Sequence, residues 1–265
     1  MLSADRPLFE THGLGVEYVA RTASGTVTGL ADIDIQWNKG EILGLLGGSG
    51  SGKTTLGRTL VGLQQPTTGD VTYQGQPLSR ALAARSFRRD VQMIFQDPYQ
   101  SLNPRRTVGQ QVTEGLDIHR IGTPGLERTA LAVAALEQSG LTPADRYWHC
   151  HPHQLSGGQR QRVVIAAALA LGPQALVCDE PVSALDVSVR SQVLQVLKQL
   201  RSDHGIGLLF ITHDVGLAWA LCDRLAVLHQ GQLVECGATE AVLKDPQASY
   251  TRALLAAMPR PLRHG

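Results

Sequence analysis

The feature that most constrains how this chain can fold is a glycine-rich loop between a short apolar segment and a helical segment. Residues 41–46 have the pattern of a buried strand, and helical periodicity starts near Lys53. Between them the sequence satisfies G-x-x-x-x-G-K-[ST], with Gly47, Gly48, Ser49, Gly50, Ser51, Gly52, Lys53 and Thr54, followed by Thr55. Glycines let successive backbone N–H groups surround phosphate oxygens, and the helix N-terminus adds its positive dipole end. A flexible glycine turn would need neither the strand nor the helix, so the sequence predicts a nucleotide-binding loop.

Strand-like and helical segments alternate along the chain. Strands are expected at 27–36, 41–46, 71–76, 91–95, 175–178 and 207–211, and helices at 53–62, 107–140 (interrupted at 122–125), 158–171 and 187–201. This alternation predicts an α/β fold with a mostly parallel, P-loop (RecA-like) sheet wrapped by helices. We expect an antiparallel β subdomain at the front and an inserted α-helical subdomain at about 100–160, because no long linker separates independent domains.

Composition narrows the class of protein. Among 265 residues, 24 Lys and Arg balance 23 Asp and Glu, so the net charge of +1 shows no electrostatic footprint for nucleic acid. The longest apolar run, Val163–Leu171, is far shorter than the roughly 20 residues that cross a bilayer. The first residues carry an early acid and a proline and have no apolar core. We therefore expect a globular protein of the cytosolic type, without a secretory signal or a spanning helix.

Polar residues follow several predicted strands, where open α/β sheets place their ligands. These residues are Gln96, the pair Asp179 and Glu180, and His213. Asp179 is expected to hold Mg²⁺ beside the phosphate loop together with the Thr54 hydroxyl. Glu180 is expected to orient and deprotonate the attacking water. Each residue alone is more often structural than catalytic, so their joint occurrence in this order carries the prediction.

A second anion-binding helix start is predicted well after the first. It comprises Ser156, Gly157, Gly158 and Gln159, which follow Leu155. A serine hydroxyl and unhindered N–H groups at a helix N-terminus suit phosphate oxygens. Two such starts more than a hundred residues apart need not serve the same site within one chain.

The cysteines and histidines give weaker signals. Cys150, Cys178, Cys222 and Cys236 show no C-x-x-C spacing, and Cys178 has the setting of a buried structural thiol. His149, Cys150, His151 and His153 cluster around a proline and could share a metal ion. Because no fourth ligand or supporting partner can be identified, a structural role is favoured there.

Six segments together resemble the ATP-binding cassette (ABC) family of transport ATPases. They are GGSGSGKT (47–54), Gln96 in MIFQDP, LSGGQ (155–159), LVCDEP (176–181), SALD (183–186) and ITHD (211–214). The resemblance runs from about Leu8 to Pro259. It implies one ATP-binding domain at 8–259, a short tail at 260–265, and ATP and Mg²⁺ as the bound groups.

The resemblance also implies a role for each matching residue. Tyr18 would stack on adenine, although an ordinary strand tyrosine is the alternative. Gln96 would sense Mg²⁺ and the water, and Glu180 would be the catalytic base. His213 would contact the γ-phosphate, and Asp186 would lie at a dimer seam. In this family two cassettes associate head to tail, so that 155–159 of one closes on nucleotide held by 47–54 of the other. This arrangement accounts for two separated anion sites.

Longer stretches are similar to the oligopeptide, dipeptide and nickel importer subfamily. They are 95–109, 151–162, 179–194 and 244–259. The similarity implies a second ABC ATPase subunit, commonly a paralogue, two membrane permeases and an extracytoplasmic binding protein. The chain would then be peripheral, on the cytoplasmic side of the inner (plasma) membrane. Because Pro152 and His153 belong to the subfamily pattern, the similarity also weakens the metal interpretation of the histidine cluster.

Two departures from the subfamily stand out. Ala167 occupies the position where the family usually carries an arginine, so turnover could be altered. Many relatives also have a cysteine-bearing C-terminal extension, whereas this sequence stops at Gly265. An iron–sulfur cluster of that kind is therefore not expected.

We expect an ATP-hydrolysing importer subunit that energises uptake of peptides, nickel or a related small solute such as a metallophore. A soluble ABC ATPase acting on nucleic acid or ribosomes is the alternative, but the sequence has no long coiled-coil insertion, zinc cysteines or tandem cassette. A P-loop kinase or GTPase would lack LSGGQ. An exporter cassette is a further alternative, although the similarity to the importer subfamily favours import. The sequence leaves undecided the transported substrate and whether the partner cassette is a copy or a paralogue.

Overall fold

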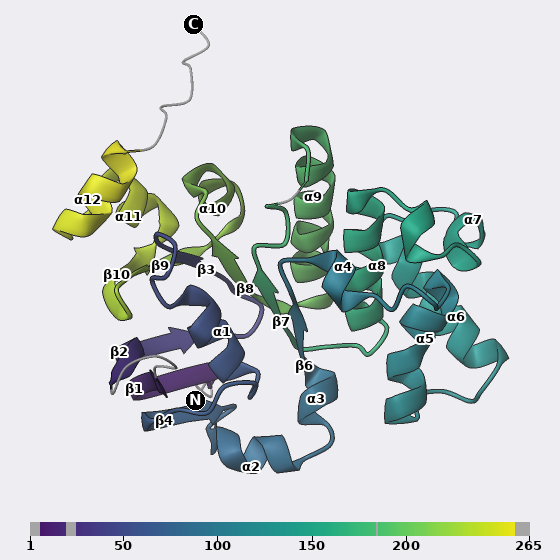
Figure 1. Cartoon of the computed structure of the whole chain (residues 1–265), viewed down its shortest axis with the longest axis horizontal. Helices are drawn as coiled ribbons and strands as arrows, with labels where there is room; N and C mark the ends of the chain where they lie inside the picture. Colours follow the sequence, from purple (N-terminus) through teal and green to yellow (C-terminus); the bar gives the residue numbers. More distant parts are fainter. Residues whose placement is uncertain (1–5, 20–24, 184, 258–265) are drawn as a thin grey trace, which may run out of the picture.

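A computed structural model describes residues 6–19, 25–183 and 185–257 (Figure 1). It contains two sheets. The smaller is antiparallel, has the order β2-β1-β4-β5, and consists of β1 (Phe9–Val19), β2 (Thr26–Trp37), β4 (Thr68–Tyr73) and β5 (Gln76–Pro77). The second half of β2 alternates buried and exposed residues, as expected for a sheet with one covered face.

The larger sheet has six strands in the order β10-β9-β3-β8-β7-β6. They are β3 (Ile42–Leu46), β6 (Val91–Ile94), β7 (Ala175–Asp179), β8 (Gly207–Thr212), β9 (Arg224–His229) and β10 (Gln232–Ala238). All neighbours pair in parallel except β10, which is antiparallel to β9. Every residue of β3, β7 and β8 is buried, because both faces of a parallel sheet are covered.

Two hydrophobic clusters cover the two faces of the larger sheet. Leu43 and Leu45 point to one cluster, which also contains Leu56 of α1 (Lys53–Leu60) and the core of the smaller sheet. Ile42 and Leu46 point to the other, which is built with helices from the middle and end of the chain. The period-2 alternation of β3 thus places its carboxyl end, and the loop that follows, between two layers.

Helices occupy most of the remaining chain. Between β4 and β6 lie α2 (Leu78–Ala83) and α3 (Phe87–Asp90), and between β6 and β7 lie α4 (Pro98–Ser101), α5 (Val108–His119), α6 (Leu126–Gln138), α7 (Asp145–Trp148) and α8 (Gly157–Leu169). The rest are α9 (Val187–His204), α10 (Val215–Leu221), α11 (Thr239–Lys244) and α12 (Ser249–Ala256). Figure 1 shows α5 to α8 gathered beyond the β6 edge of the larger sheet. Among the helices described, none is long and apolar enough to cross a membrane.

The structure confirms the predicted fold class, divides one predicted strand, and contains three strands that were not predicted, β1, β9 and β10. Residues 71–76 were expected as a single strand, but β4 ends at Tyr73 and β5 begins at Gln76. Gln74 and Gly75 both have positive φ (51° and 75°), so the chain turns there and β5 pairs back on β4 in the antiparallel direction. The helical segment at 107–140 is interrupted as predicted, with α5 ending and α6 starting on either side of Gly122–Gly125. Residues 258–265, which include the predicted tail and the end of the predicted domain, lie outside the described residues, as does Ala184 of SALD.

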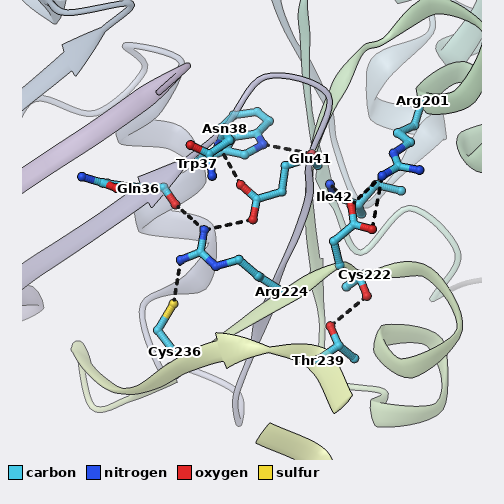
Figure 2. Close-up of polar contacts among 11 residues, drawn as sticks. Gln36, Trp37, Asn38, Glu41, Ile42, Arg201, Cys222, Arg224, Cys236 and Thr239 are labelled. Atoms are coloured by element: carbon cyan, nitrogen blue, oxygen red, sulfur yellow. Dashed lines mark hydrogen bonds and ion pairs between the residues drawn. The ribbon is translucent and has the colours of Figure 1, made fainter. Parts of the chain in front are cut away.

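A polar network fixes the start of the strand that carries the phosphate loop (Figure 2). Glu41, only 8% exposed, accepts hydrogen bonds from Arg224 (2.9 Å) and from the Asn38 backbone N–H (2.7 Å). The Ile42 N–H donates to Asp223 at 2.9 Å. Because Arg224 belongs to β9 and Asp223 precedes it, the network ties the beginning of β3 to a segment late in the chain.

Removing the Glu41 carboxylate is expected to destabilise the fold. Glu41→Ala leaves Arg224 and the Asn38 N–H without their acceptor in a largely buried place, and we expect the free energy of unfolding to fall by about 2 kcal/mol. Urea unfolding followed by circular dichroism measures it. Glu240→Ala is the control, because the Glu240–Lys244 pair is exposed and should contribute nothing measurable. Equal stability of Glu41→Ala and the parent protein would contradict the role given to the network.

Candidate active site

The glycine-rich loop joins β3 to α1 and adopts a conformation that requires glycine at two places. A Cβ on Gly47 would lie 2.3 Å from the Leu228 carbonyl oxygen, and Gly47 has φ +156°. A Cβ on Gly52 would lie 2.7 Å from the Gly29 carbonyl oxygen, and Gly52 has φ +102°. The loop is therefore packed tightly against β9 and β2, and no side chain fits at either position.

Lys53 lies folded back over the loop. Its ammonium donates to the carbonyl oxygens of Gly47 (2.9 Å) and Gly48 (2.7 Å) and to the Ser51 hydroxyl (3.3 Å). Burial lowers the pKa of Lys53, while the nearby Glu180 and Asp179 carboxylates act in the opposite direction. A buried cation held only by neutral carbonyls and a hydroxyl is well placed to move toward phosphate oxygens.

Thr54 and Asp179 meet across the end of the sheet. The Thr54 hydroxyl donates to the Asp179 carboxylate at 3.0 Å, although 125 residues separate them. Burial raises the pKa of Asp179, and the Thr54 hydrogen bond partly offsets this. A hydroxyl and a carboxylate supply the hard oxygen ligands that Mg²⁺ prefers, so the pair fits the predicted metal role.

Three predicted residues converge directly after the end of β7. The Glu180 carboxylate accepts a hydrogen bond from Gln96 Nε2 (3.2 Å) and lies 3.0 Å from His213 Nδ1. The Glu180 side chain is mostly covered, whereas that of His213 is 62% exposed. Glu180 has φ +46°, a left-handed conformation that costs a residue with a Cβ about 1 kcal/mol or more. Strained backbone, together with two polar partners, holds this carboxylate in one place.

Tyr18, near the end of β1, lies beside the first turn of α1. Its hydroxyl is within hydrogen-bond distance of the Thr55 hydroxyl (3.1 Å), and the residue is 38% exposed. A Cβ on Gly29 would lie 2.6 Å from the Tyr18 ring, so Gly29 makes room for it. The sequence reasoning missed Gly29, because its strand neighbour cannot be identified before the β1–β2 register is known. Tyr18 is thus an exposed aromatic ring beside the loop.

The LSGGQ segment belongs to a different part of the molecule. Ser156 and Gln159 form a reciprocal cap at the start of α8, with Ser156 N donating to Gln159 Oε1 (2.9 Å) and Gln159 N to Ser156 Oγ (3.3 Å). A Cβ on Gly158 would lie 2.1 Å from Val189, so this glycine is also a packing requirement against α9. Asp186, at the N-cap of α9, is exposed and makes no capping hydrogen bond. Among the described residues, these side chains make no hydrogen bond to the 47–54 loop.

The histidine cluster lies close to the start of α8. The rings of His151 and His153 stack with centroids 5.7 Å apart, beside the short turn that precedes α8. In the described part of the chain no three His, Cys, Asp or Glu side chains are grouped to hold a metal ion.

Ala167 lines a cavity of about 800 Å³ that reaches Thr54, Gln96 and Asp179. Arg58 is the only cation among the described residues that line this cavity, and it favours the charged form of Asp179.

This chain is similar to known proteins in both sequence and structure. A family model described as ABC transporter matches residues 30–183. The oligopeptide transport ATP-binding protein OppF of Bacillus subtilis is 43% identical over 245 residues, which cover 91% of this chain and 79% of OppF. A dimeric post-hydrolysis structure of the ATP-binding cassette MJ0796 with ADP and Pi has a TM-score of 0.77 and 28% identity, covering 87% of this chain and 98% of that one. CbiO1 of Clostridium perfringens, part of the ABC transporter complex cbiONQ, has a TM-score of 0.79 and 26% identity, covering 96% and 97%.

Proposed function

The chain belongs to the ABC transporter family, and we propose that it is the ATP-hydrolysing subunit of an importer for peptides or a related small solute. The observation that carries the proposal is the Glu180 carboxylate, held between Gln96 and His213 beside the phosphate loop. A binding module without turnover would need no carboxylate fixed at this point. The similarity to OppF supports the peptide class of substrate.

The loop and its neighbours bind ATP. Backbone N–H groups within the 47–54 loop surround the phosphates, and Lys53 leaves the carbonyls of Gly47 and Gly48 for the β- and γ-phosphate oxygens. The adenine ring stacks on the exposed ring of Tyr18. Thr55 keeps the Tyr18 hydroxyl near the loop helix.

Thr54, Asp179 and Gln96 would hold Mg²⁺ with the phosphates. Bound there, the ion would neutralise charge that develops on the transferred phosphoryl group. Burial raises the pKa of Asp179, and the Thr54 hydrogen bond and the nearby Arg58 and Lys53 cations only partly offset this. A divalent cation at the same oxygen atoms would favour the charged carboxylate.

Glu180 acts as the general base. Gln96 and His213 orient its carboxylate, which accepts a proton from the water that attacks the γ-phosphate of ATP. The products are ADP and phosphate. His213, whose side chain is largely exposed, also lies where it can contact the γ-phosphate. Gln96 donates a hydrogen bond to this carboxylate and also lines the cavity, so it can contact both the metal ion and the water.

Turnover requires a second cassette. In the described residues, the Ser156–Gln159 cap makes no hydrogen bond to the phosphate loop of its own chain. The helix start at this cap suits the phosphates held by a head-to-tail partner, and Asp186 lies at the dimer seam. The partner is a second ABC ATPase subunit, either a copy or a paralogue. We propose that residues about 100–160 move as a subdomain when the pair closes. Closure drives transport because ATP makes contacts in the closed pair that it lacks in the open one.

The remaining partners are two membrane permeases and an extracytoplasmic binding protein, with the chain on the cytoplasmic face of the membrane. The cavity that opens between β6 and the helices α4, α5 and α8 is where a permease would contact the Gln96 segment. A soluble ABC ATPase that acts on nucleic acid is less well supported, because the chain has a net charge of only +1.

Reconstitution tests the proposal. The chain is assembled with its partner cassette, the two permeases and the binding protein, in liposomes that contain MgATP. We expect uptake of a labelled oligopeptide that stops when internal ATP is replaced by ADP. Liposomes that take up a nickel chelate but no peptide would correct the substrate class. ATPase activity stimulated by nucleic acid, without uptake of any solute, would contradict the transport function.

A further inference from the structure

The C-terminal helix contacts the phosphate loop directly, a contact that the mechanism above does not use. α12 begins at Ser249, and its second residue, Tyr250, approaches the loop from 202 residues away in sequence. The Gly48 backbone N–H donates to the Tyr250 hydroxyl at 3.3 Å. This segment matched a subfamily pattern in the sequence, but no function followed from the match.

The peptide group that contacts Tyr250 also contacts Lys53 of the phosphate loop. A peptide unit is planar, so the Gly47 carbonyl and the Gly48 N–H turn together. The carbonyl accepts a hydrogen bond from Lys53 (2.9 Å), while the N–H donates to Tyr250. Because a glycine stands on each side, the backbone itself gives this plane little resistance to rotation. The phenol and the Lys53 ammonium therefore both restrain this peptide group.

The Tyr250 ring is itself fixed. It stacks on the His229 ring with centroids 3.8 Å apart and an interplanar angle of 24°. His229 ends β9, and in the turn that follows the Gly231 N–H donates to the Ser51 carbonyl at 3.1 Å. The loop is thus held at Gly48 by α12 and at Ser51 by the β9–β10 turn, and the His229–Tyr250 stack joins the two supports.

The start of α12 is anchored to the larger sheet. The Glu235 carboxylate of β10 accepts hydrogen bonds from the backbone N–H groups of Gln247 (2.8 Å) and Ala248 (3.1 Å). An acid at a helix N-terminus satisfies otherwise unpaired donors and stabilises the helix. Tyr250 therefore stands on a helix whose position relative to β10 is fixed.

We propose that Tyr250 is a positioning residue of the phosphate loop, which fixes the Gly47–Gly48 peptide and so raises the affinity for ATP. The inference rests on nucleotide binding at this loop and adds the C-terminal helix to the structure that binds it. It predicts that the hydroxyl matters for nucleotide affinity, whereas the ring matters for packing. Tyr250 itself does not touch the reacting atoms.

Tyr250→Phe in the full chain tests the proposal, because it removes the hydroxyl and keeps the ring on His229. We expect about threefold to tenfold weaker binding of a fluorescent ATP analogue, the equivalent of one lost hydrogen bond. We also expect faster hydrogen exchange in peptides that cover residues 47–52 of the nucleotide-free protein. Tyr73→Phe is the matched control, since it removes a phenol hydroxyl that accepts from Gln74 (3.2 Å), away from the loop. Its ATP affinity should equal that of the parent.

Each outcome decides the matter. Unchanged affinity and unchanged exchange at residues 47–52 in Tyr250→Phe would overturn the proposal, and so would an equal loss of affinity in Tyr73→Phe. If the parent protein bound no ATP analogue, the proposed function would fail instead. In that case, faster exchange of the loop in Tyr250→Phe would still support the positioning role.

Discussion

Glu180→Gln is expected to abolish ATP hydrolysis while ATP binding is retained. The amide has the shape of the carboxylate, so the side chain keeps its place between Gln96 and His213. It cannot accept the proton of the attacking water. Since a general base contributes about 10²- to 10⁴-fold, we expect the turnover number to fall at least about 100-fold. The Kd for ATP should change by less than about threefold, because Glu180 is not among the groups that hold the phosphates.

Phosphate release at saturating MgATP measures the turnover number, and titration with a fluorescent analogue measures the affinity. Glu137→Gln is the control, because Glu137 is an exposed residue of α6 far from the loop. It makes the same change of charge. Full activity in Glu180→Gln would show that another group accepts the proton, and the assignment of the base would be wrong.

Lys53→Ala is expected to weaken ATP binding itself, by about 100-fold. Charge-assisted hydrogen bonds to the β- and γ-phosphates contribute about 1.5–3 kcal/mol each, and this substitution removes them. The nucleotide-free fold should tolerate the change. Burial lowers the pKa of Lys53, which means that the folded protein pays for keeping this cation away from water.

Two measurements separate a loss of ATP affinity from a loss of folding stability. Equilibrium titration should show the loss of affinity, while thermal unfolding without nucleotide should give a melting temperature close to that of the parent. Lys198→Ala, at an exposed position of α9, controls for loss of a positive charge. An ATP affinity unchanged by Lys53→Ala would remove the basis for treating residues 47–54 as the phosphate site.

The fold and most of the candidate site were predictable because the signals are local. The phosphate loop is a contiguous motif, and Asp179, Gln96 and His213 each follow an apolar strand. Parallel strands bring their carboxyl ends to one edge, so residues at those ends meet whatever their separation in sequence. The structure brings Glu180, Gln96 and His213 together in this way.

Other parts were not predictable, since they depend on packing between distant segments. Gly158 looked like an anion-binding glycine, yet its lack of a side chain is also required by Val189 on α9. Gly29 and Tyr250 carry no pattern that marks them as neighbours of Tyr18 and Gly48. The β9–β10 hairpin and α12 reach the loop only through the order of strands in the sheet. Such contacts follow from topology, which a single sequence constrains weakly.

The position of β3 within the sheet has a consequence for biosynthesis. β3 pairs on one side with β8 and on the other with β9, both of which come late in the chain. While the ribosome makes the first half of the protein, the apolar segment Ile42–Leu46 has no partner strand on either edge. An unpaired apolar strand of this kind favours aggregation and recruits chaperones. The supports that the loop receives from the β9–β10 turn and from α12 form only after these late segments have emerged.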